Sequence, residues 1–508
     1  GFKKSAIWNK LYNFQQDACL GIINKLEKYN GCILADSVGL GKTFTALAVI
    51  KYYESRNNRV LVLCPKKLAN NWNIYKNNYK NNSIAEDRLR YDVLFHTDLN
   101  RKHGLSNGND LAFINWGNYD LVVIDESHNF RNGYGTHINT KENRYMQLMN
   151  KVIKQGVKTK VLMLSATPVN NRFIDLKNQL ALAYEGVTEN IDDQLKTKGS
   201  IDDIFRAAQT AFNKWSQFPA EERTTENLLS MLSFDFFEVL DSVTIARSRK
   251  HIEKYYDTKD IGTFPKRLVP ISISSPLTKD ESDVTYNLIF EELNKLNLYV
   301  YVPTIFIQKS KRYKYDLGED DASGFDQMGR ELGIRRLMAI NLLKRLESSV
   351  YSFRLTIQRV KTYINHTIKI VEDFEAHKTN PNVNLTDMTM EDEMDFDDQN
   401  SSDSFAIGKK VKIDLNDMDY VSWLRNLKED VGILSGLECL IEDITPDNDT
   451  KLQKLLEIIA KKINNPINPG NKKVIVFSAF ADTAEYLFEN VSGYVKKNFN
   501  LESAMVTG

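Results

Sequence analysis

The segment "ADSVGLGKTF", Ala35 to Phe44, places two glycines, a lysine and a threonine between an apolar run and a run with helical spacing. Glycines let backbone N–H groups approach phosphate oxygens, and the helix N-terminus adds the positive end of its dipole. In such a loop Lys42 would reach the outer phosphates of a nucleotide, and the Thr43 hydroxyl would hold Mg²⁺. Because the usual pattern has a glycine where Asp36 stands, an ordinary strand-to-helix turn is the alternative interpretation.

Two carboxylates follow a second apolar run, in "YDLVVIDESHNF". Acidic residues at the carboxyl end of a strand in a doubly wound sheet face the crevice where ligands bind. We expect Asp125 to bind Mg²⁺, directly or through water, and Glu126 to orient and deprotonate an attacking water. The alternative is an acidic turn after a core strand.

Four apolar runs of strand length have to position these residues. They begin at Gly31, Arg59, Tyr119 and Lys160, and the last ends in the hydroxyl-bearing run Ser165-Ala166-Thr167. Stretches with helical spacing separate the runs, and this alternation predicts an α/β fold with a parallel sheet.

The composition limits the class of protein. With 508 residues the chain is too long for one ordinary core, and its 67 basic and 67 acidic residues give a net charge of zero. The four cysteines (Cys19, Cys32, Cys64 and Cys439) form no CxxC pair, so we expect free thiols in a reducing compartment and no zinc site. No apolar stretch approaches the roughly 18 residues of a spanning helix. We therefore expect a soluble cytoplasmic protein.

These segments together resemble helicase superfamily two and, within it, the Swi/Snf-type double-stranded DNA translocases. "ADSVGLGKT" is similar to that family's Walker A motif, in which an acidic residue commonly replaces the first glycine. "DESH", residues 125–128, is similar to its DEAH-like Walker B motif, and "LSATPVNN" to its coupling motif. The resemblance, which is strong for residues 11–180, implies that ATP contacts Asp36, Ser37, Val38, Gly39, Leu40, Gly41, Lys42 and Thr43.

The same resemblance implies further roles. Gln15, in "LYNFQQDAC", would read adenine, with a plain amphipathic helix as the alternative. His128, Ser165, Ala166 and Thr167 would transmit the state of the γ-phosphate to the nucleic-acid groove. Lys66 and Lys67, in "CPKKLANNW", would contact a nucleic-acid backbone, unless they are an ordinary solvated pair. Arg247 and Arg249 would touch phosphate or the second lobe, or lie on a solvated helix face.

The resemblance also predicts a division of the chain. We expect a first RecA-like ATP-binding lobe at 1–255, a mainly helical insertion at 256–445, and the start of a second RecA-like lobe at 446–508. Apolar residues recur every three or four positions from Leu346 to Phe374, which indicates an amphipathic helix. Unbroken from about Arg330 to His377, it would extend roughly 70 Å. The acidic stretch near 386–406 is expected to be a disordered loop.

"KKVIVFSAF" and "SAMVTG" resemble the first strands of the second lobe. The family's last motifs, which carry the arginines that complete hydrolysis, are not found after them. The resemblance therefore implies that residues 1–508 end within the second lobe and turn ATP over slowly on their own.

These observations predict an ATP hydrolase that moves along duplex DNA, uses ATP and Mg²⁺, and works in the bacterial cytoplasm, associated with the nucleoid and not with a membrane. Such motors are often fused to a nuclease, so a nuclease or other domain outside this sequence is a candidate partner. An RNA or single-stranded DNA helicase is one alternative. A nucleotide-gated nucleic-acid-binding or scaffold module without turnover is the other.

Overall fold

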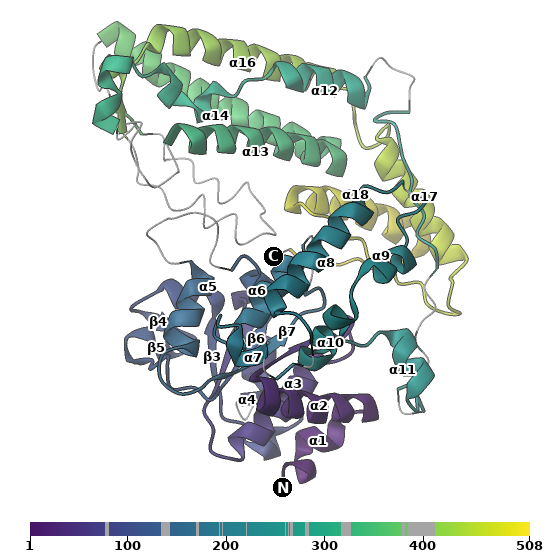
Figure 1. The fold of residues 1–508 in the computed structure, drawn as a ribbon. Helices are drawn as coiled ribbons and strands as arrows, with labels where there is room; N and C mark the ends of the chain where they lie inside the picture. Colours follow the sequence, from purple (N-terminus) through teal and green to yellow (C-terminus); the bar gives the residue numbers. More distant parts are fainter. Residues whose placement is uncertain are drawn as a thin grey trace. The chain divides into compact units, whose positions relative to one another are not determined.

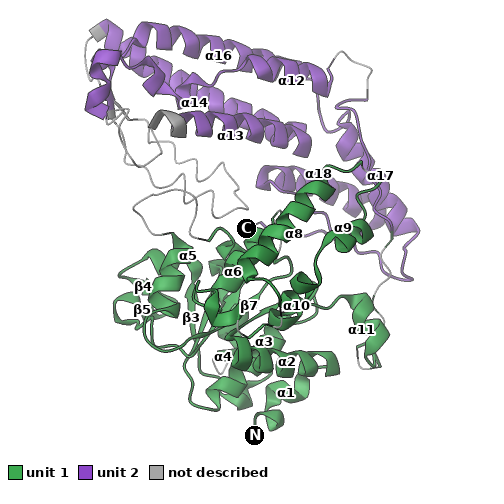
Figure 2. Cartoon of the chain, in the orientation of Figure 1, with its two compact units in different colours: residues 1–268 green, residues 269–508 purple. Residues whose placement is uncertain are grey.

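The computed structural model (Figure 1) describes residues 1–507 except 77–80, 134–142, 169–171, 193, 196, 220, 260, 263, 265–267, 280–283, 316–326, 378–381 and 385–411. The chain forms two compact units, residues 1–268 and 269–508 (Figure 2). The expected division into three parts stays a prediction. The acidic stretch 386–406 lies outside the described residues.

Unit 1 is built on a parallel sheet of six strands in the order β3-β2-β6-β7-β1-β8. The predicted α/β fold with a parallel sheet is confirmed. The edge strands β3 and β8 are additional to the four expected ones. The strands are β1 (Gly31–Leu34), β2 (Val60–Cys64), β3 (Asp92–Phe95), β6 (Leu121–Asp125), β7 (Lys160–Leu164) and β8 (Thr244–Ile245). A small antiparallel pair, β4 (Leu105–Ser106) and β5 (Asn109–Asp110), is separate from the sheet.

Helices cover both faces of the sheet, so its central strands are buried on both sides. Leu121 and Val123 of β6 join the core formed with α1, α2, α3 and α4, whereas Val122 and Ile124 join the core formed with α5, α6, α8 and α10. The helices of unit 1 are α1 (Ala6–Lys10), α2 (Asn13–Tyr29), α3 (Lys42–Glu54), α4 (Ala69–Lys76), α5 (Arg144–Gln147), α6 (Phe173–Ala181), α7 (Glu189–Asp192), α8 (Ile201–Ser216), α9 (Thr225–Met231), α10 (Phe234–Val243) and α11 (Arg249–Tyr255).

The cysteines are free thiols, three of them buried and Cys439 exposed. Burial raises the pKa of Cys19, Cys32 and Cys64 to about 12, so these thiols stay protonated and unreactive. Within the described residues, no helix has the length and hydropathy needed to cross a membrane.

Unit 2 is mainly helical. Its helices are α12 (Tyr286–Lys295), α13 (Gln327–Ser348), α14 (Val350–His377), α16 (Tyr420–Leu440), α17 (Thr450–Asn464) and α18 (Ala481–Phe499), and β9 (Asn382–Asn384) pairs antiparallel with β10 (Lys412–Asp414). The predicted apolar stripe is buried at each of its positions from Leu346 to Phe374. It packs in one core with α13 and α16.

The long helix is interrupted at Ser349, so a continuous rod from 330 to 377 does not form. Thr304 Oγ1 donates to Glu331 of α13 at 2.5 Å, and the nearby Tyr301 ring stacks on Tyr363 of α14 at 6.3 Å. In one straight helix residues 331 and 363 would be about 48 Å apart, so α13 and α14 fold back on each other, as Figure 1 shows. The Ser349 hydroxyl accepts the N–H of Ser352 at 3.0 Å and caps α14.

Replacing Phe353 by alanine is expected to lower the free energy of unfolding of unit 2 by about 3–5 kcal/mol, because its ring is fully buried in this core. Lys369, on the exposed face of the same helix, is the control, and its alanine variant should stay within about 0.5 kcal/mol of the wild type. Urea unfolding followed by circular dichroism checks both. Equal effects of the two changes would contradict the packing of this core.

The two segments predicted to open a second sheet do not form hydrogen-bonded strands. Residues 472–480 and 501–507 have no regular secondary structure, and Ile475, Phe477 and Val506 are 78%, 89% and 93% exposed. A parallel strand of this apolar composition is stable only between neighbouring strands and under helices on both faces. Neither segment has such neighbours among the described residues. The second RecA-like lobe stays a prediction.

Candidate active site

Two glycines in left-handed conformation shape the loop between β1 and α3. Gly39 has φ of 83°, and Gly41, which precedes the first residue of α3, has φ of 76°. A Cβ on Gly41 would lie 2.4 Å from Nε2 of Gln15, so both the backbone conformation and the available space require glycine. Val38 is 71% exposed. The loop therefore presents backbone N–H groups and the N-terminus of α3 to an approaching anion.

The first residue of α3, Lys42, turns its side chain back across this loop. Its ammonium group donates to the backbone carbonyl of Asp36 at 2.9 Å. It also interacts electrostatically with the carboxylates of Asp125 and Glu126. Thr43 follows in the same helical turn and is half-buried. Lys42 therefore lies close to Asp125 and Glu126, although more than 80 residues separate them in the sequence.

The register of the sheet explains this meeting. Leu164 at the end of β7 pairs with Leu34 at the end of β1 on one side and with Asp125 at the end of β6 on the other. The loops that leave β1, β6 and β7 therefore start at the same level of the sheet, at its carboxyl edge. This is the edge where open α/β sheets bind ligands.

Asp125 is held by two hydrogen bonds. Its Oδ2 accepts the indole N–H of Trp72 at 2.9 Å, and its Oδ1 accepts the backbone N–H of Glu126 at 3.0 Å. Burial raises the pKa of this carboxyl, and both hydrogen bonds oppose the rise. The bonds favour the ionised form, which is the form that ligates a cation.

Glu126 begins a chain of contacts toward the end of β7. Its backbone is left-handed, with φ of 51°. Its Oε2 lies 3.3 Å from Nδ1 of His128, and this hydrogen bond holds the pKa of Glu126 below its ordinary value, although burial opposes it. The same Nδ1 lies 3.4 Å from the Ser165 hydroxyl, which accepts the N–H of Thr167 at 3.2 Å. The expected coupling residues 128 and 165–167, Ala166 included, are therefore neighbours. The asparagines expected to close the motif, residues 170 and 171, lie outside the described residues.

Gln179 of α6 is a positioning residue that sequence patterns did not predict. Its fully buried amide accepts from the Ser127 hydroxyl at 2.9 Å and donates to the carbonyl of Pro168 at 2.7 Å. It thereby ties the loop after β6 to the loop after β7. In the sequence it is one polar residue in an amphipathic helix, and no motif marks it. Trp72, the donor to Asp125, was not predicted either, although it stands in the same segment as the two lysines.

Replacing Gln179 by alanine is expected to lower the free energy of unfolding of unit 1 by about 2 kcal/mol, because the buried Ser127 hydroxyl and the partly buried carbonyl of Pro168 lose their hydrogen bonds to this amide. The exposed Gln217, at the end of α8, provides the control, and its alanine variant should unfold like the wild type. Urea unfolding measures the difference. Two indistinguishable unfolding curves would show that Gln179 does not tie the loops together.

Gln15, the predicted adenine reader, is 5% exposed and lies against the phosphate loop. Its Oε1 accepts the N–H of Tyr12 at 3.0 Å, and its Nε2 donates to the carbonyl of Leu40 at 3.0 Å. These bonds fix the position of the amide beside Gly41. The role of Gln15 toward adenine stays a prediction.

The four basic residues that were expected to contact phosphate or nucleic acid differ in burial and in their partners. Arg247 is buried, and its guanidinium pairs with Asp36, so it is not a free phosphate or interlobe contact. Arg249 is half-buried and donates to the carbonyl of Val38 at 3.3 Å. Lys66 and Lys67, in the short turn after β2, are exposed.

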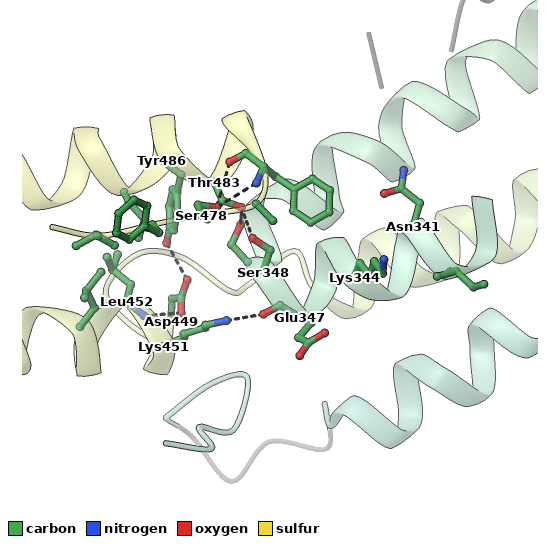
Figure 3. Close-up of a pocket in the computed structure, with 18 of the residues that line it drawn as sticks. Asn341, Lys344, Glu347, Ser348, Asp449, Lys451, Leu452, Ser478, Thr483 and Tyr486 are labelled. Atoms are coloured by element: carbon green, nitrogen blue, oxygen red, sulfur yellow. Dashed lines mark hydrogen bonds between the residues drawn. The ribbon is translucent and has the colours of Figure 1, made fainter. Parts of the chain in front are cut away.

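A cavity of about 830 Å³ lies within unit 2 (Figure 3). The C-terminal end of α13, the first turn of α17 and residues 476–487 line it. Several of its polar groups bond to one another: Tyr486 donates to Asp449 at 2.9 Å, and the hydroxyls of Ser348 and Thr483 lie 2.8 Å apart. These bonds join the helical hairpin to α17 and α18, which is a structural role.

Part of the chain is similar to known proteins. Residues 15–255 match the family model of the SNF2-related domain. The chain is similar to the uncharacterized ATP-dependent helicase YqhH of Bacillus subtilis, with 30% identity over 32% of this chain and 28% of that protein. It is also similar to the ATP-dependent helicase FUN30 of Saccharomyces cerevisiae, with 28% identity over 48% of this chain and 22% of that protein.

The matched part of the chain thus spans roughly a quarter of the length of these two relatives. Among solved structures, the Sulfolobus solfataricus SWI2/SNF2 ATPase core in complex with dsDNA aligns with 16% identity and a TM-score of 0.31, over 66% of this chain and 65% of that one.

Proposed function

Because residues 15–255 form an SNF2-related domain of the Swi/Snf-type ATPases, we propose that the chain binds and hydrolyses ATP and uses the energy to move along duplex DNA. One observation carries the ATPase part of the proposal. The glycine loop, the lysine at its end and the carboxylates of Asp125 and Glu126 meet at the carboxyl edge of the sheet. Phosphoryl transfer needs this set: donors for the phosphates, a cation ligand and a residue that handles water.

The residues present fit ATP and Mg²⁺. Gly39 and Gly41 leave the backbone of the loop open. The Lys42 ammonium donates to a neutral carbonyl, which does not neutralise its charge, so we expect this charge to reach phosphate. Thr43 and Asp125 would hold Mg²⁺ together with phosphate oxygens, a set of oxygen donors typical of this ion. Bound Mg²⁺ would neutralise part of the phosphate charge.

We propose that Glu126 acts on the attacking water. Its lowered pKa keeps it ionised at neutral pH, so it accepts a proton only as the water attacks phosphorus. The bond to His128 orients this carboxylate. His128 in turn contacts Ser165, so a change at the γ-phosphate that moves Glu126 reaches the loop after β7. We propose this chain as the route from nucleotide state to the nucleic-acid groove.

The DNA part of the proposal has two supports. The named relatives are ATP-dependent helicases. In addition, Lys66 and Lys67 are exposed beside the sheet edge, although the net charge of the chain is zero. These lysines would contact backbone phosphates and not bases. Binding is therefore expected to depend steeply on salt and little on sequence.

Replacing Lys66 or Lys67 by alanine is expected to lower the slope of log affinity against log salt for duplex DNA by about 0.9 for each phosphate that the variant no longer neutralises. The exposed Lys10 is the control, and its variant should keep the wild-type slope. Fluorescence anisotropy with a labelled duplex, between low and moderate salt, provides the measurement. An unchanged slope in both variants would remove these lysines from the interface.

Steady-state phosphate release with no nucleic acid, duplex DNA, single-stranded DNA or RNA tests the whole proposal. We expect hydrolysis that depends on Mg²⁺, with duplex DNA as the preferred effector. Stimulation by RNA or single strands alone would favour a helicase of another substrate class. ATP binding without turnover under any condition would favour a nucleotide-gated binding module.

A further inference from the structure

We propose that Arg247 is a positioning residue that holds the start of α2, which carries Gln15, against the phosphate loop. The segment expected to contact adenine and the loop expected to contact the phosphates then form one preformed nucleotide site. This inference rests on the proposed function, because it concerns the same nucleotide site. It adds a residue from the end of unit 1 to a site otherwise built from strands β1, β6 and β7.

Arg247 forms a buried, two-pronged ion pair with Asp36. Its side chain is 6% exposed and that of Asp36 is 0% exposed. Its Nε donates to Oδ1 at 3.0 Å and its Nη2 to Oδ2 at 2.5 Å, while its backbone N–H donates to Oδ1 at 3.0 Å. A guanidinium matches a carboxylate in this planar geometry, and a lysine does not.

The same guanidinium also contacts the start of α2. Its Nη1 donates to the carbonyl of Phe14, and its carbon lies 5.1 Å from the centre of the Phe14 ring. Phe14 is 2% exposed and directly precedes Gln15, whose amide bonds to the carbonyl of Leu40. One buried side chain thus joins the segment beside Gln15 to the first residue of the phosphate loop.

The backbone around Arg247 fixes the loop as well. Strand β8 adds to the edge of the sheet beside β1, and its pairing continues past the last strand residues. The carbonyl of Ile245 accepts the N–H of Ala35 at 2.7 Å, and the carbonyl of Arg247 accepts the N–H of Ser37 at 3.0 Å. The beginning of the phosphate loop is therefore held in an extended form before its glycines turn.

This arrangement explains why an acid stands where many phosphate loops have glycine. An unpaired carboxylate at Asp36 would repel the phosphates, and its burial without a partner would be costly. Arg247 neutralises it and turns the side chain away from the loop surface. Meanwhile the main-chain carbonyl of Asp36 accepts the Lys42 ammonium at 2.9 Å. The ion pair and the position of Lys42 therefore depend on the same residue.

The test is to replace Arg247 by lysine, which keeps the charge but cannot hold both carboxylate oxygens and the Phe14 carbonyl. Calorimetry measures the affinity of the full chain for ATP and for inorganic triphosphate, each with Mg²⁺. We expect the affinity for ATP to fall about ten-fold or more and the affinity for triphosphate to fall less. The ratio of the ATP affinity to the triphosphate affinity should therefore decrease. A residue that only supports folding would not change this ratio.

Arg206 provides the matched control, because it forms an exposed pair with Asp203, with side chains 74% and 63% exposed. Its lysine variant should keep both affinities. If the Arg247→Lys variant melts well below the wild type, the Asp36→Asn variant is tested in its place. This change keeps an oxygen that accepts the Arg247 N–H, and it should lower the same ratio of ATP affinity to triphosphate affinity.

A folded variant with the wild-type ratio of the two affinities, or with equal losses for ATP and triphosphate, overturns the inference and leaves the proposed function standing. A wild-type chain that binds neither ligand overturns both.

Discussion

Replacing Glu126 by glutamine is expected to leave the affinity for ATP and Mg²⁺ unchanged and to lower the rate of hydrolysis by about 10²–10⁴-fold. The amide keeps the size of the side chain and can still bond to His128, which lies 3.3 Å from the carboxylate. It cannot accept a proton from water, and general base catalysis contributes an effect of this size. Because the change acts only on the reacting state, it separates binding from chemistry.

The measurement combines calorimetry for binding with phosphate release for turnover. Glu221 is an exposed glutamate of the same unit, and its glutamine variant should match the wild type in both assays. A Glu126 variant that hydrolyses ATP at the wild-type rate would show that another group activates the water. A variant that loses ATP binding as well would place Glu126 in ground-state binding and not in catalysis.

Replacing Lys42 by alanine is expected to weaken ATP binding by about 100-fold or more. Its ammonium group is bonded to the Asp36 carbonyl and interacts with Asp125 and Glu126. Without this ammonium group, the phosphates of ATP lose their main cationic donor. They then lie near the negative charges of Asp125 and Glu126 with less compensation. Charge-assisted hydrogen bonds of this kind are worth enough to produce such a loss.

Lys158, exposed and outside the loop, is the control. Its alanine variant should bind ATP like the wild type, and circular dichroism should show that both variants are folded. Equal ATP affinity in the wild type and the Lys42 variant would remove the phosphate-loop assignment.

Local patterns were enough to predict the sheet and which residues meet at its carboxyl edge. Each expected strand is a run of apolar residues with its chemical group directly after it, as in β6 with Asp125 and Glu126. Because parallel strands end at one edge, predicting the strands also predicts that their terminal residues meet. The apolar stripe of α14 was predictable for the same reason, since a period of three to four residues specifies one buried face.

What escaped prediction depends on contacts between distant residues. Asp36 and Arg247 are 211 positions apart in the chain, and Gln179 reaches partners on two loops that no pattern links. The break at Ser349 falls inside an uninterrupted helical pattern, and only packing against α16 and the segment near Tyr301 reveals it. The unpaired segment at 474–477 has the composition of a strand, but composition does not supply the neighbouring strands.

Hydrogen exchange of the wild-type chain, measured by mass spectrometry with and without ATP and Mg²⁺, tests most directly where the nucleotide binds. We predict slower exchange in peptides that cover residues 35–45 and 121–128, and no such change in the Lys42→Ala variant. Peptides around the cavity of unit 2, residues 476–487, should exchange at the same rate in all samples. Protection at 476–487 with none at 35–45 would contradict the proposed site, because the nucleotide would then bind away from the phosphate loop.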